Sequence, residues 1–348
     1  MIKVSKGNII DAESEALVNT VNCIGFMGKG IALQFKKAFP ENFEAYSHAC
    51  RAKEVNPGRM FVYETGNMLN PRYIINFPTK WHWRENSRLE DIESGLQSLV
   101  QEIRQRGIKS VAVPPLGCGL GGLDWQVVRP MIEKAMSQVP DVDVKLFEPA
   151  GTPKAKEMPV HTKRPRMTVA RSLFIKLMKQ YSELAYRLTL LEIQKLAYFL
   201  QEAGEPLRLR YEAGLYGPYA HNLNKVLEAL EGHFIRGYGD TQRPDVEIEL
   251  LPGAVQEAES FLVNHPDTQP RLERVGNLIE GFETPYGMEL LSSVHWVAHA
   301  DEPAMNSDEA INKIHHWADR KKKLFKPDHI RIAWERLQKQ GWLNVEGN

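Results

Sequence analysis

The sequence predicts an α/β domain with a mixed, largely parallel sheet between helices, followed by a second, mainly α-helical domain. Short apolar segments alternate with helical patterns over residues 1–150, as in an α/β layer structure. Residues 151–170 combine prolines with five basic side chains, which is typical of an extended linker. Over residues 171–348, apolar side chains recur mostly at helical spacing. We therefore expect two domains joined by a basic linker.

The first domain is expected to contain six short strands and four helices. The strands are expected at 2–4, 16–18, 60–63, 73–77, 111–114 and 144–147, and the helices at 30–39, 41–53, 88–105 and 125–137. Ligands of such sheets bind outside the carboxyl ends of the strands. Loops 19–30, 78–87 and 115–124 are rich in glycine and polar residues, and each follows an expected strand. We expect the functional site in these three loops.

The second domain is expected to be built from helices with few strands. The helices are expected in a continuous pattern from Ser172 and at 222–232, 253–263, 270–280, 286–299, 307–318 and 327–339, with short strands at 208–211 and 246–250. Residues 171–348 carry 26 acidic against 21 basic side chains. This balance excludes a strongly basic nucleic-acid-binding domain, although a local basic groove stays possible.

Composition predicts an ordinary globular protein of the cytoplasm. The chain has 348 residues, 43% hydrophobic and 25% charged, which is enough for two cores. No apolar run reaches membrane-spanning length, and the N-terminus leads directly into a strand, so we expect neither a signal peptide nor a membrane partner. Three cysteines without a CxxC pair argue against a disulfide framework and a structural zinc site, and we expect no metal.

Two glycine-rich loops have the pattern of a phosphate site. Asn19–Gly30 leaves an apolar strand and enters a helix, and glycines let backbone N–H groups approach an anion. Its spacing matches neither the Walker A pattern nor the Rossmann fingerprint, and a plain tight turn is the alternative. The second loop, Gly117–Gly121, also lies between a strand and a helix, with Asp124 as an expected N-cap. Together the loops could grip a diphosphate from both sides.

The third loop contributes a lysine among aromatic residues. Lys80 is followed by Trp81, His82 and Trp83, at the point where a strand is expected to end. A solvated surface lysine is the alternative, because lysine is rarely buried. The tryptophans could stack on a nucleic-acid base.

These motifs resemble the macrodomains, an ADP-ribose-binding fold. The resemblance rests on Lys6–Ile10, Met27–Ala32 with the helix that follows it, and Leu116–Leu120. Phe77-Pro78-Thr79-Lys80 is similar to the motif of ADP-ribose glycohydrolases that use a catalytic lysine. The two-domain layout resembles the DarG antitoxins, which remove ADP-ribose that the toxin DarT attaches to thymidine in single-stranded DNA.

The resemblance implies roles for individual residues. Lys80 is expected to be catalytic, and Asn22 and His82 to orient the substrate. The residues expected to bind ADP-ribose are Asn8, Ile9, Asn19, Gly28, Lys29, Gly30, Ile31, Thr79, Gly117, Cys118, Gly119, Leu120 and Gly121. ADP-ribose is expected as ligand and product, with no cofactor. The expected partners are ADP-ribosylated single-stranded DNA and DarT, the latter bound by the second domain through segments that resemble other antitoxins.

Two positions depart from the family pattern. Asn8 stands where many macrodomains have an aspartate that holds the adenine amino group, and its side-chain oxygen can still accept that bond. Gly121 stands where relatives that cleave ADP-ribose esters have an aspartate. A lysine–aspartate pair is therefore not expected.

The residues also suggest how the reaction would proceed. Cleavage between ribose and thymine N3 builds negative charge on the departing base, and an ammonium at Lys80 would stabilise it. The alternative is that a neutral Lys80 attacks the ribose as a nucleophile. Two other functions stay open: a non-catalytic ADP-ribose reader that acts only by binding the toxin, and a hydrolase of protein or O-acetyl ADP-ribose esters.

Overall fold

The computed structural model of the chain describes residues 1–149, 157–184, 187–239 and 243–343. Residues 151–156 of the expected linker lie outside this description. The chain divides into two compact units, Met1–Lys163 and Arg164–Asn348, and each is described by itself below. This division falls inside the range 151–170. The first helix of the second unit begins at Val169.

The first unit is built on one six-stranded sheet, as predicted. Its strands are β1 (Ile2–Ser5), β2 (Ala16–Asn22), β3 (Phe61–Glu64), β4 (Tyr73–Lys80), β5 (Ser110–Val113) and β6 (Asp143–Phe147). Their order across the sheet is β1-β6-β5-β2-β4-β3. All neighbours are parallel except β3 and β4, which pair antiparallel at one edge. The mixed, largely parallel sheet of the prediction is confirmed.

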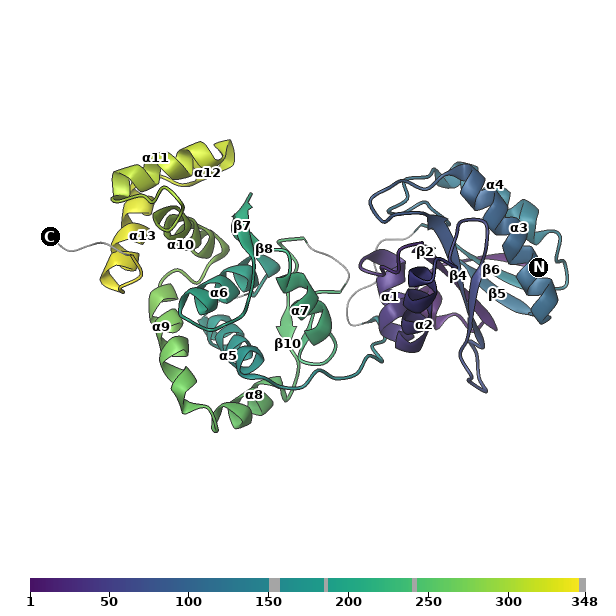
Figure 1. The fold of residues 1–348 in the computed structure, drawn as a ribbon, viewed down its shortest axis with the longest axis horizontal. Helices are drawn as coiled ribbons and strands as arrows, with labels where there is room; N and C mark the ends of the chain where they lie inside the picture. The colour runs from purple at the N-terminus through teal and green to yellow at the C-terminus, as the bar shows by residue number, and fades with distance from the viewer. Residues whose placement is uncertain (150–156, 185–186, 240–242, 344–348) are drawn as a thin grey trace. The chain divides into compact units, whose positions relative to one another are not determined.

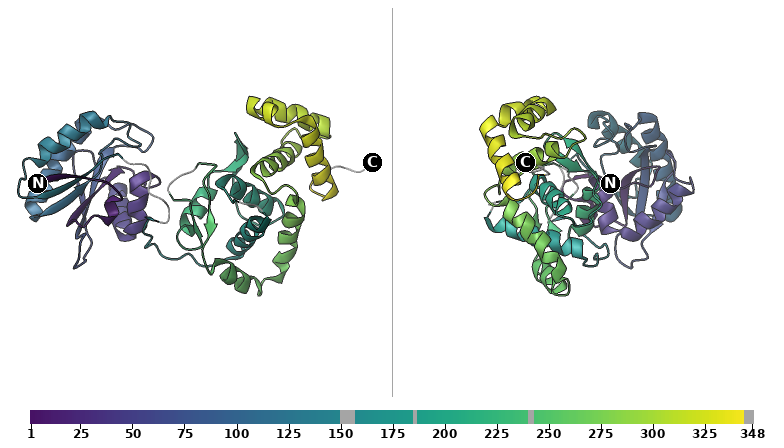
Figure 2. Two further views of the ribbon diagram at one scale, coloured as in Figure 1. Left: turned by 180° about the vertical axis from the view of Figure 1, so that it is seen from behind. Right: turned by 60° about the vertical axis from the view of Figure 1, so that its left-hand side comes forward.

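Helices cover both faces of this sheet (Figures 1 and 2). They are α1 (Gly30–Ala38), α2 (Pro40–Arg51), α3 (Leu89–Arg106) and α4 (Trp125–Met136), with a short 3-10 helix η1 at Ile9–Asp11. Helices α3 and α4 pack on the face that carries Val18 and Phe77. Helix α1 packs on the opposite face, where Phe35 contacts Leu17 and Ile74. Residues of β2, β4, β5 and β6 thus enter two separate cores, which requires apolar residues on both faces of these strands.

The neighbouring strands β2 and β4 run further than predicted. Strand β2 continues from Val18 to Asn22, and β4 continues from Phe77 to Lys80. The polar residues at their ends pair as a parallel ladder, with a register shift between Val21 and Asn22. Apolar patterning missed this extension because polar side chains occupy ladder positions. The loops of the site therefore begin at Cys23 and Trp81.

The second unit is mainly helical, as predicted. Its helices are α5 (Val169–Leu184), α6 (Leu190–Glu202), α7 (Leu223–Leu230), α8 (Ala254–Leu262), α9 (Gln269–Ile279), α10 (Pro285–Ala298), α11 (Ser307–Trp317), α12 (Asp319–Leu324) and α13 (Pro327–Lys339), with a 3-10 helix η3 at Pro266–Thr268. Ten of the fourteen residues of α10 are buried. A helix enclosed on so many sides is the centre of a core. Among the described residues, no helix has the length and apolar character needed to cross a membrane.

Two small antiparallel pairs complete the second unit, and they differ from the predicted strands. They are β7 (Tyr211–Gly214) with β8 (Gly217–Ala220), and β9 (Ile235–Arg236) with β10 (Glu249–Leu250). The strand predicted at 208–211 therefore begins only at its last residue, and the one predicted at 246–250 is two residues long. The pattern missed β8 because Gly217 and Pro218 are typical of turns, whereas the turn is at Leu215 and Tyr216.

Candidate active site

Three loops meet at the carboxyl edge of the sheet. Strands β5, β2 and β4 are parallel neighbours, so their carboxyl ends lie at the same edge. The loops that follow them are 23–29, 81–88 and 114–124. The N–H of Cys23 donates to the carbonyl of Trp81 at 3.1 Å, which ties the first loop to the second. The N–H of Ser87 donates to the carbonyl of Gly121 at 2.9 Å, which ties the second to the third.

Lys80 is the residue on which these loops converge. It is the last residue of β4, and its side chain is only 9% exposed. Its Nζ donates to the carbonyl of Glu85 at 3.1 Å and to the carbonyl of Leu120 at 2.8 Å. The amine therefore bridges the second and third loops. A solvated surface lysine, the alternative from the sequence, does not describe this side chain.

Burial changes the acid–base behaviour of Lys80. It lowers the pKa of the amine below its ordinary value, and the nearby Glu85 carboxylate opposes that shift. The carbonyl dipoles of Glu85 and Leu120 point their negative ends at Nζ and favour the ammonium form. A buried cation in a fixed position is suited to stabilise negative charge as it forms.

Asn22 is used to shape the first loop. It pairs with Lys80 across the ladder and is 6% exposed. Its Nδ2 donates to the carbonyl of Phe26 at 2.5 Å, while its Oδ1 accepts from the N–H groups of Ile24 at 3.0 Å and Phe26 at 3.3 Å. The hydroxyl of Tyr46 donates to the backbone carbonyl of Asn22 at 2.6 Å. In this structure the amide therefore holds the loop in place, and any contact with substrate would come in addition.

The first loop opens into helix α1 with free backbone donors. The N-cap residue, Lys29, is exposed, and no side chain caps the helix. Gly30 has φ +58°, a conformation that favours glycine. A Cβ placed on Gly30 would lie 3.7 Å from Leu120, so the first and third loops face each other closely. Unpaired N–H groups at a helix start bind anions well. Ile31, half-buried, follows in the first turn.

The third loop is folded tightly against the second. Gly117 and Gly121 are buried, whereas Gly119 and Leu120 are exposed. A Cβ on Gly121 would lie 2.3 Å from Ser87 Oγ and 2.4 Å from the carbonyl oxygen of Gly117. Such distances leave no room for any side chain. An aspartate beside Lys80 is therefore excluded at this position by the backbone itself.

Gly121→Asp should consequently damage the loop rather than create a lysine–aspartate pair. We expect the free energy of unfolding to fall by about 1–3 kcal/mol, the usual cost of overpacking. Urea titration of the variant and the wild type measures this change. Gly119→Ala is the matched control, because a Cβ there meets no atom within 4 Å. Equal stability of Gly121→Asp and the wild type would contradict this account of the loop.

Asn8 lies in the loop after β1 and keeps one polar group free. It caps η1, and its Oδ1 accepts from the N–H of Ile10 at 3.1 Å. Its Nδ2 is buried without a hydrogen-bond partner. A buried unpaired donor is costly, so an acceptor on a ligand would stabilise it. The side-chain oxygen expected to hold the adenine amino group is thus already engaged by the backbone, and the free group is a donor.

Three residues predicted to contact ADP-ribose lie beneath the surface. Asn19 is fully buried, and its Nδ2 donates to Asn76 Oδ1 at 2.9 Å. Thr79 and Ile9 are each 4% exposed, with Thr79 Oγ1 donating to the carbonyl of Val21 at 3.4 Å. The side chains of Asn19 and Thr79 are enclosed because β2 and β4 extend past them. The Asn19 amide joins strands β2 and β4 through Asn76, and its role in ADP-ribose binding stays a prediction.

His82 lies on the second loop, next to exposed aromatic rings. It is half-buried, its Nδ1 accepts from the N–H of Arg84 at 3.2 Å, and its ring stacks on Trp83 at 5.4 Å. Gly28, half-buried, lies under the ring of Phe26, since a Cβ there would be 2.3 Å from that ring.

The cysteines of the loops are unsuited to act as nucleophiles. Burial, with smaller effects from Cys50 and Asp91, raises the pKa of the Cys23 thiol to about 12. Burial and the neighbouring Asp124 raise the pKa of Cys118, which is half-buried, to about 11. A nucleophilic cysteine needs a lowered pKa, so packing is the role these contacts support.

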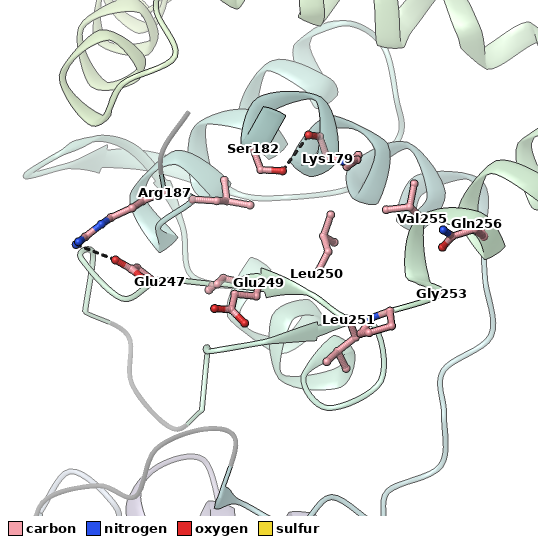
Figure 3. A pocket seen from close by; sticks show the side chains of 13 residues that line it. Lys179, Ser182, Arg187, Glu247, Glu249, Leu250, Leu251, Gly253, Val255 and Gln256 are labelled. Atoms are coloured by element: carbon pink, nitrogen blue, oxygen red, sulfur yellow. Dashed lines mark hydrogen bonds and ion pairs between the residues drawn. The ribbon is translucent and has the colours of Figure 1, made fainter. Parts of the chain in front are cut away.

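Within the described part of the second unit, the charged hollow next to α5 can be compared with the site around Lys80. A hollow of about 500 Å³ lies between α5 and the segment 247–256 (Figure 3). Three of its charged groups are paired, Arg187 with Glu247 at 2.8 Å and Lys179 with Glu183 at 3.1 Å. It contains none of the predicted site residues. Across the described ranges, no group of three or more His, Cys, Asp or Glu side chains is placed to hold a metal ion.

Comparison with known proteins agrees with the fold and the loops. The family model described as "Macro domain" matches residues 18–132. A Thermus aquaticus protein named DNA ADP-ribosyl glycohydrolase is 46% identical, over 99% of this chain and 95% of its own. The solved macrodomain of Mycobacterium tuberculosis DarG is 54% identical, covering 43% of this chain and 99% of that one, with a TM-score of 0.43. A Thermosipho africanus fusion of a DNA ADP-ribosyl transferase with a DNA ADP-ribosyl glycohydrolase is 34% identical, over 42% of each chain.

The sheet order, the glycine loops and the family match define a macrodomain protein with an attached helical unit. With 46% identity over nearly its whole length, the chain belongs to the DNA ADP-ribosyl glycohydrolase family. It is therefore a hydrolase, and family membership favours the enzyme over the non-catalytic reader.

Proposed function

We propose that this chain hydrolyses the N-glycosidic bond between ADP-ribose and thymidine in single-stranded DNA, and that its second unit binds the toxin that makes this modification. The observation that carries the proposal is the position of Lys80. Lys80 is buried at the end of β4. Its amine donates to one carbonyl in each of the two loops that flank the predicted ADP-ribose site. The similarity to DNA ADP-ribosyl glycohydrolases provides the substrate class.

The loops would bind the ADP-ribosyl group. The diphosphate would be held by the start of α1 and by the exposed backbone at Gly119, with Lys29 adding positive charge. The unpaired Nδ2 of Asn8 would donate to an acceptor atom of the adenine ring. The binding groups are all provided by the chain, so the proposal requires no cofactor besides water. ADP-ribose is both the bound group and the product.

The proposed chemistry breaks one bond with one water. As the bond between the ribose carbon and thymine N3 breaks, its electron pair leaves with N3, giving an imide anion spread over two carbonyl oxygens. The Lys80 ammonium would donate to one of these oxygens with its third N–H, since the other two are directed to Glu85 and Leu120. Water adds hydroxide to the ribose carbon, and its proton ends on N3. Electrostatic stabilisation of this kind is commonly the largest single catalytic effect.

The crowded Gly121 position supports this reaction over ester hydrolysis. Ester-cleaving relatives are expected to pair lysine with aspartate, and a side chain at Gly121 would meet backbone atoms at 2.4 Å. The test compares two substrates, thymidine-linked ADP-ribose in an oligonucleotide and glutamate-linked ADP-ribose in a peptide. We expect release from the first only. Faster release from the glutamate-linked substrate would remove the proposal.

The pH dependence of turnover separates the ammonium from the nucleophile. Burial lowers the pKa of Lys80, so the ammonium is lost at a lower pH than for an exposed lysine, whose pKa is about 10.4. If the ammonium is the active form, kcat falls as pH rises through this lowered pKa. In Lys80→Arg the guanidinium stays charged, so any remaining activity should lack this alkaline decline. A wild-type kcat that rises with pH over the same range would instead support a neutral nucleophile.

The second unit is proposed to bind DarT and block its access to DNA. The fusion of transferase and glycohydrolase in the Thermosipho africanus relative supports a functional connection between the two activities. The acidic excess of residues 171–348 suits a basic, DNA-binding partner surface. The full chain with Lys80→Ala should still reduce DNA modification when mixed with DarT before DNA is added. No reduction and no complex on gel filtration would remove this part of the proposal.

A further inference from the structure

The loops around Lys80 carry exposed aromatic rings that the proposed chemistry does not use. Trp81 is 50% exposed, Phe26 48% and Trp83 43%. These three rings, with His82 and Arg84, are called the aromatic ledge here. Two of these exposed rings lie within three residues of Lys80, and Phe26 from the neighbouring loop contacts Trp83, so together they indicate an interaction surface. We propose that the aromatic ledge binds the unpaired bases next to the modified thymidine; this rests on the proposed function.

The ledge is a built feature of the loops. The rings of Phe26 and Trp83 come from different loops, and their centroids lie 5.9 Å apart with a tilt of 38°. The backbone N–H and carbonyl of Phe26 both bond to the side chain of Asn22. The ring lies directly over Gly28, where a Cβ would be 2.3 Å from the ring and would displace it. A ring held by this many contacts loses little conformational freedom when it binds, which favours affinity.

The charge on the ledge suits a nucleic-acid strand. The guanidinium of Arg84 lies 4.7 Å from the ring centroid of Trp83, and His82 stacks on that ring at 5.4 Å and 28°. Aromatic faces with an adjoining cation are the usual means of binding single-stranded nucleic acid, where rings stack on bases and cations contact phosphates. Bases in a duplex stack on one another and do not offer their faces. The ledge therefore selects a single strand.

The position of the ledge connects it to the reaction. Trp81 directly follows Lys80 at the end of β4, and its carbonyl accepts from the N–H of Cys23 at 3.1 Å, which ties the loops of the ledge together beside the lysine. Asn22, which holds Phe26, pairs with Lys80 across the ladder. A strand bound on the ledge would thus place its modified thymidine within reach of Lys80. The ledge should affect binding of the DNA chain, and leave the chemical step intact.

The test measures kinetics of Trp83→Ala on two substrates, ADP-ribosyl thymidine nucleoside and an ADP-ribosylated single-stranded oligonucleotide. We expect KM for the oligonucleotide to rise about 5- to 150-fold, the range that loss of one base–aromatic stack produces. KM and kcat for the nucleoside should stay unchanged. Trp83→Phe should restore most of the oligonucleotide affinity. Met68→Ala, at a 99% exposed position on the turn between β3 and β4, is the matched control.

Two results would contradict the proposal that the aromatic ledge binds bases. An unchanged oligonucleotide KM shows that no base stacks on Trp83. Equal increases in KM for both substrates show that the ring contacts the ADP-ribosyl group instead. Binding of unmodified single-stranded DNA, followed by tryptophan fluorescence and compared with duplex DNA, gives a second readout that needs no turnover. If the wild type releases ADP-ribose from neither substrate, the proposed function fails. The fluorescence titration still tests whether the aromatic ledge binds single-stranded DNA. Equal affinity for single-stranded and duplex DNA would show that the ledge does not bind unpaired bases.

Discussion

Lys80→Ala should lower kcat for release of ADP-ribose from thymidine-linked DNA by about 10²–10³-fold, the loss found when one preorganised electrostatic donor is removed. The methyl group of alanine cannot reach the departing thymine, and the carbonyls of Glu85 and Leu120 lose their shared donor. The diphosphate-binding loop and the start of α1 do not involve this amine. Single-turnover rates at saturating enzyme measure the effect.

The same variant should still bind ADP-ribose with an affinity close to that of the wild type. Isothermal titration with free ADP-ribose checks this. Lys80→Arg is the matched variant, because it keeps a cation and two or more donors at the same place. Near-normal turnover by Lys80→Ala would show that another group stabilises the leaving thymine.

Glu289→Gln should destabilise the second unit by about 3–5 kcal/mol, the cost of breaking a buried ion pair from one side. Glu289 is 2% exposed and lies on the central helix α10. It accepts from Arg320 at 2.6 and 3.0 Å and from Lys321 at 2.9 Å. Lys321 is fully buried, so without the carboxylate its ammonium would lack an opposing charge; burial already lowers its pKa.

Calorimetric melting of the full chain measures this effect, with ADP-ribose added to identify the transition of the first unit. The transition of the second unit should move to lower temperature while the ligand-stabilised one stays in place. Glu335→Gln, on the exposed face of α13, is the matched control. If Glu289→Gln and Glu335→Gln melt alike, the buried cluster is not important for stability.

The sequence predicted the fold of the first unit well because its signals are local. Each strand is a short apolar segment, each helix has regular spacing, and the glycine loops follow the central strands. The helix ends were found within two residues by these patterns. Sequence patterns could not show that Asn19 continues the ladder opposite Asn76, or that Thr79 is enclosed at the register shift, because their burial depends on packing across β2 and β4.

The sequence indicated the loops and the lysine of the candidate site, but not the hydrogen-bond partners of these residues. Lys80 was identified from a motif, but its carbonyl partners at Glu85 and Leu120 come from separate loops and leave no pattern in sequence. In the second unit, too, the sequence did not indicate the partners of buried side chains. His295 and His299 are one turn apart, yet the structure stacks them at 4.2 Å and directs His295 to the hydroxyl of Tyr198 at 2.7 Å. Burial lowers the pKa of His295 to about 3, so it stays neutral in this core.

The reaction we propose breaks the bond between ribose and thymine and thereby restores unmodified DNA. The most direct measurement is the intact mass of a thymidine-ADP-ribosylated oligonucleotide before and after incubation with the wild type and with Lys80→Ala. We expect the wild type to return the oligonucleotide to its unmodified mass and to release ADP-ribose, while Lys80→Ala leaves it modified over the same time. An oligonucleotide that keeps its full mass with the wild type, or that retains ribose phosphate after cleavage elsewhere in the ADP-ribosyl group, would contradict it.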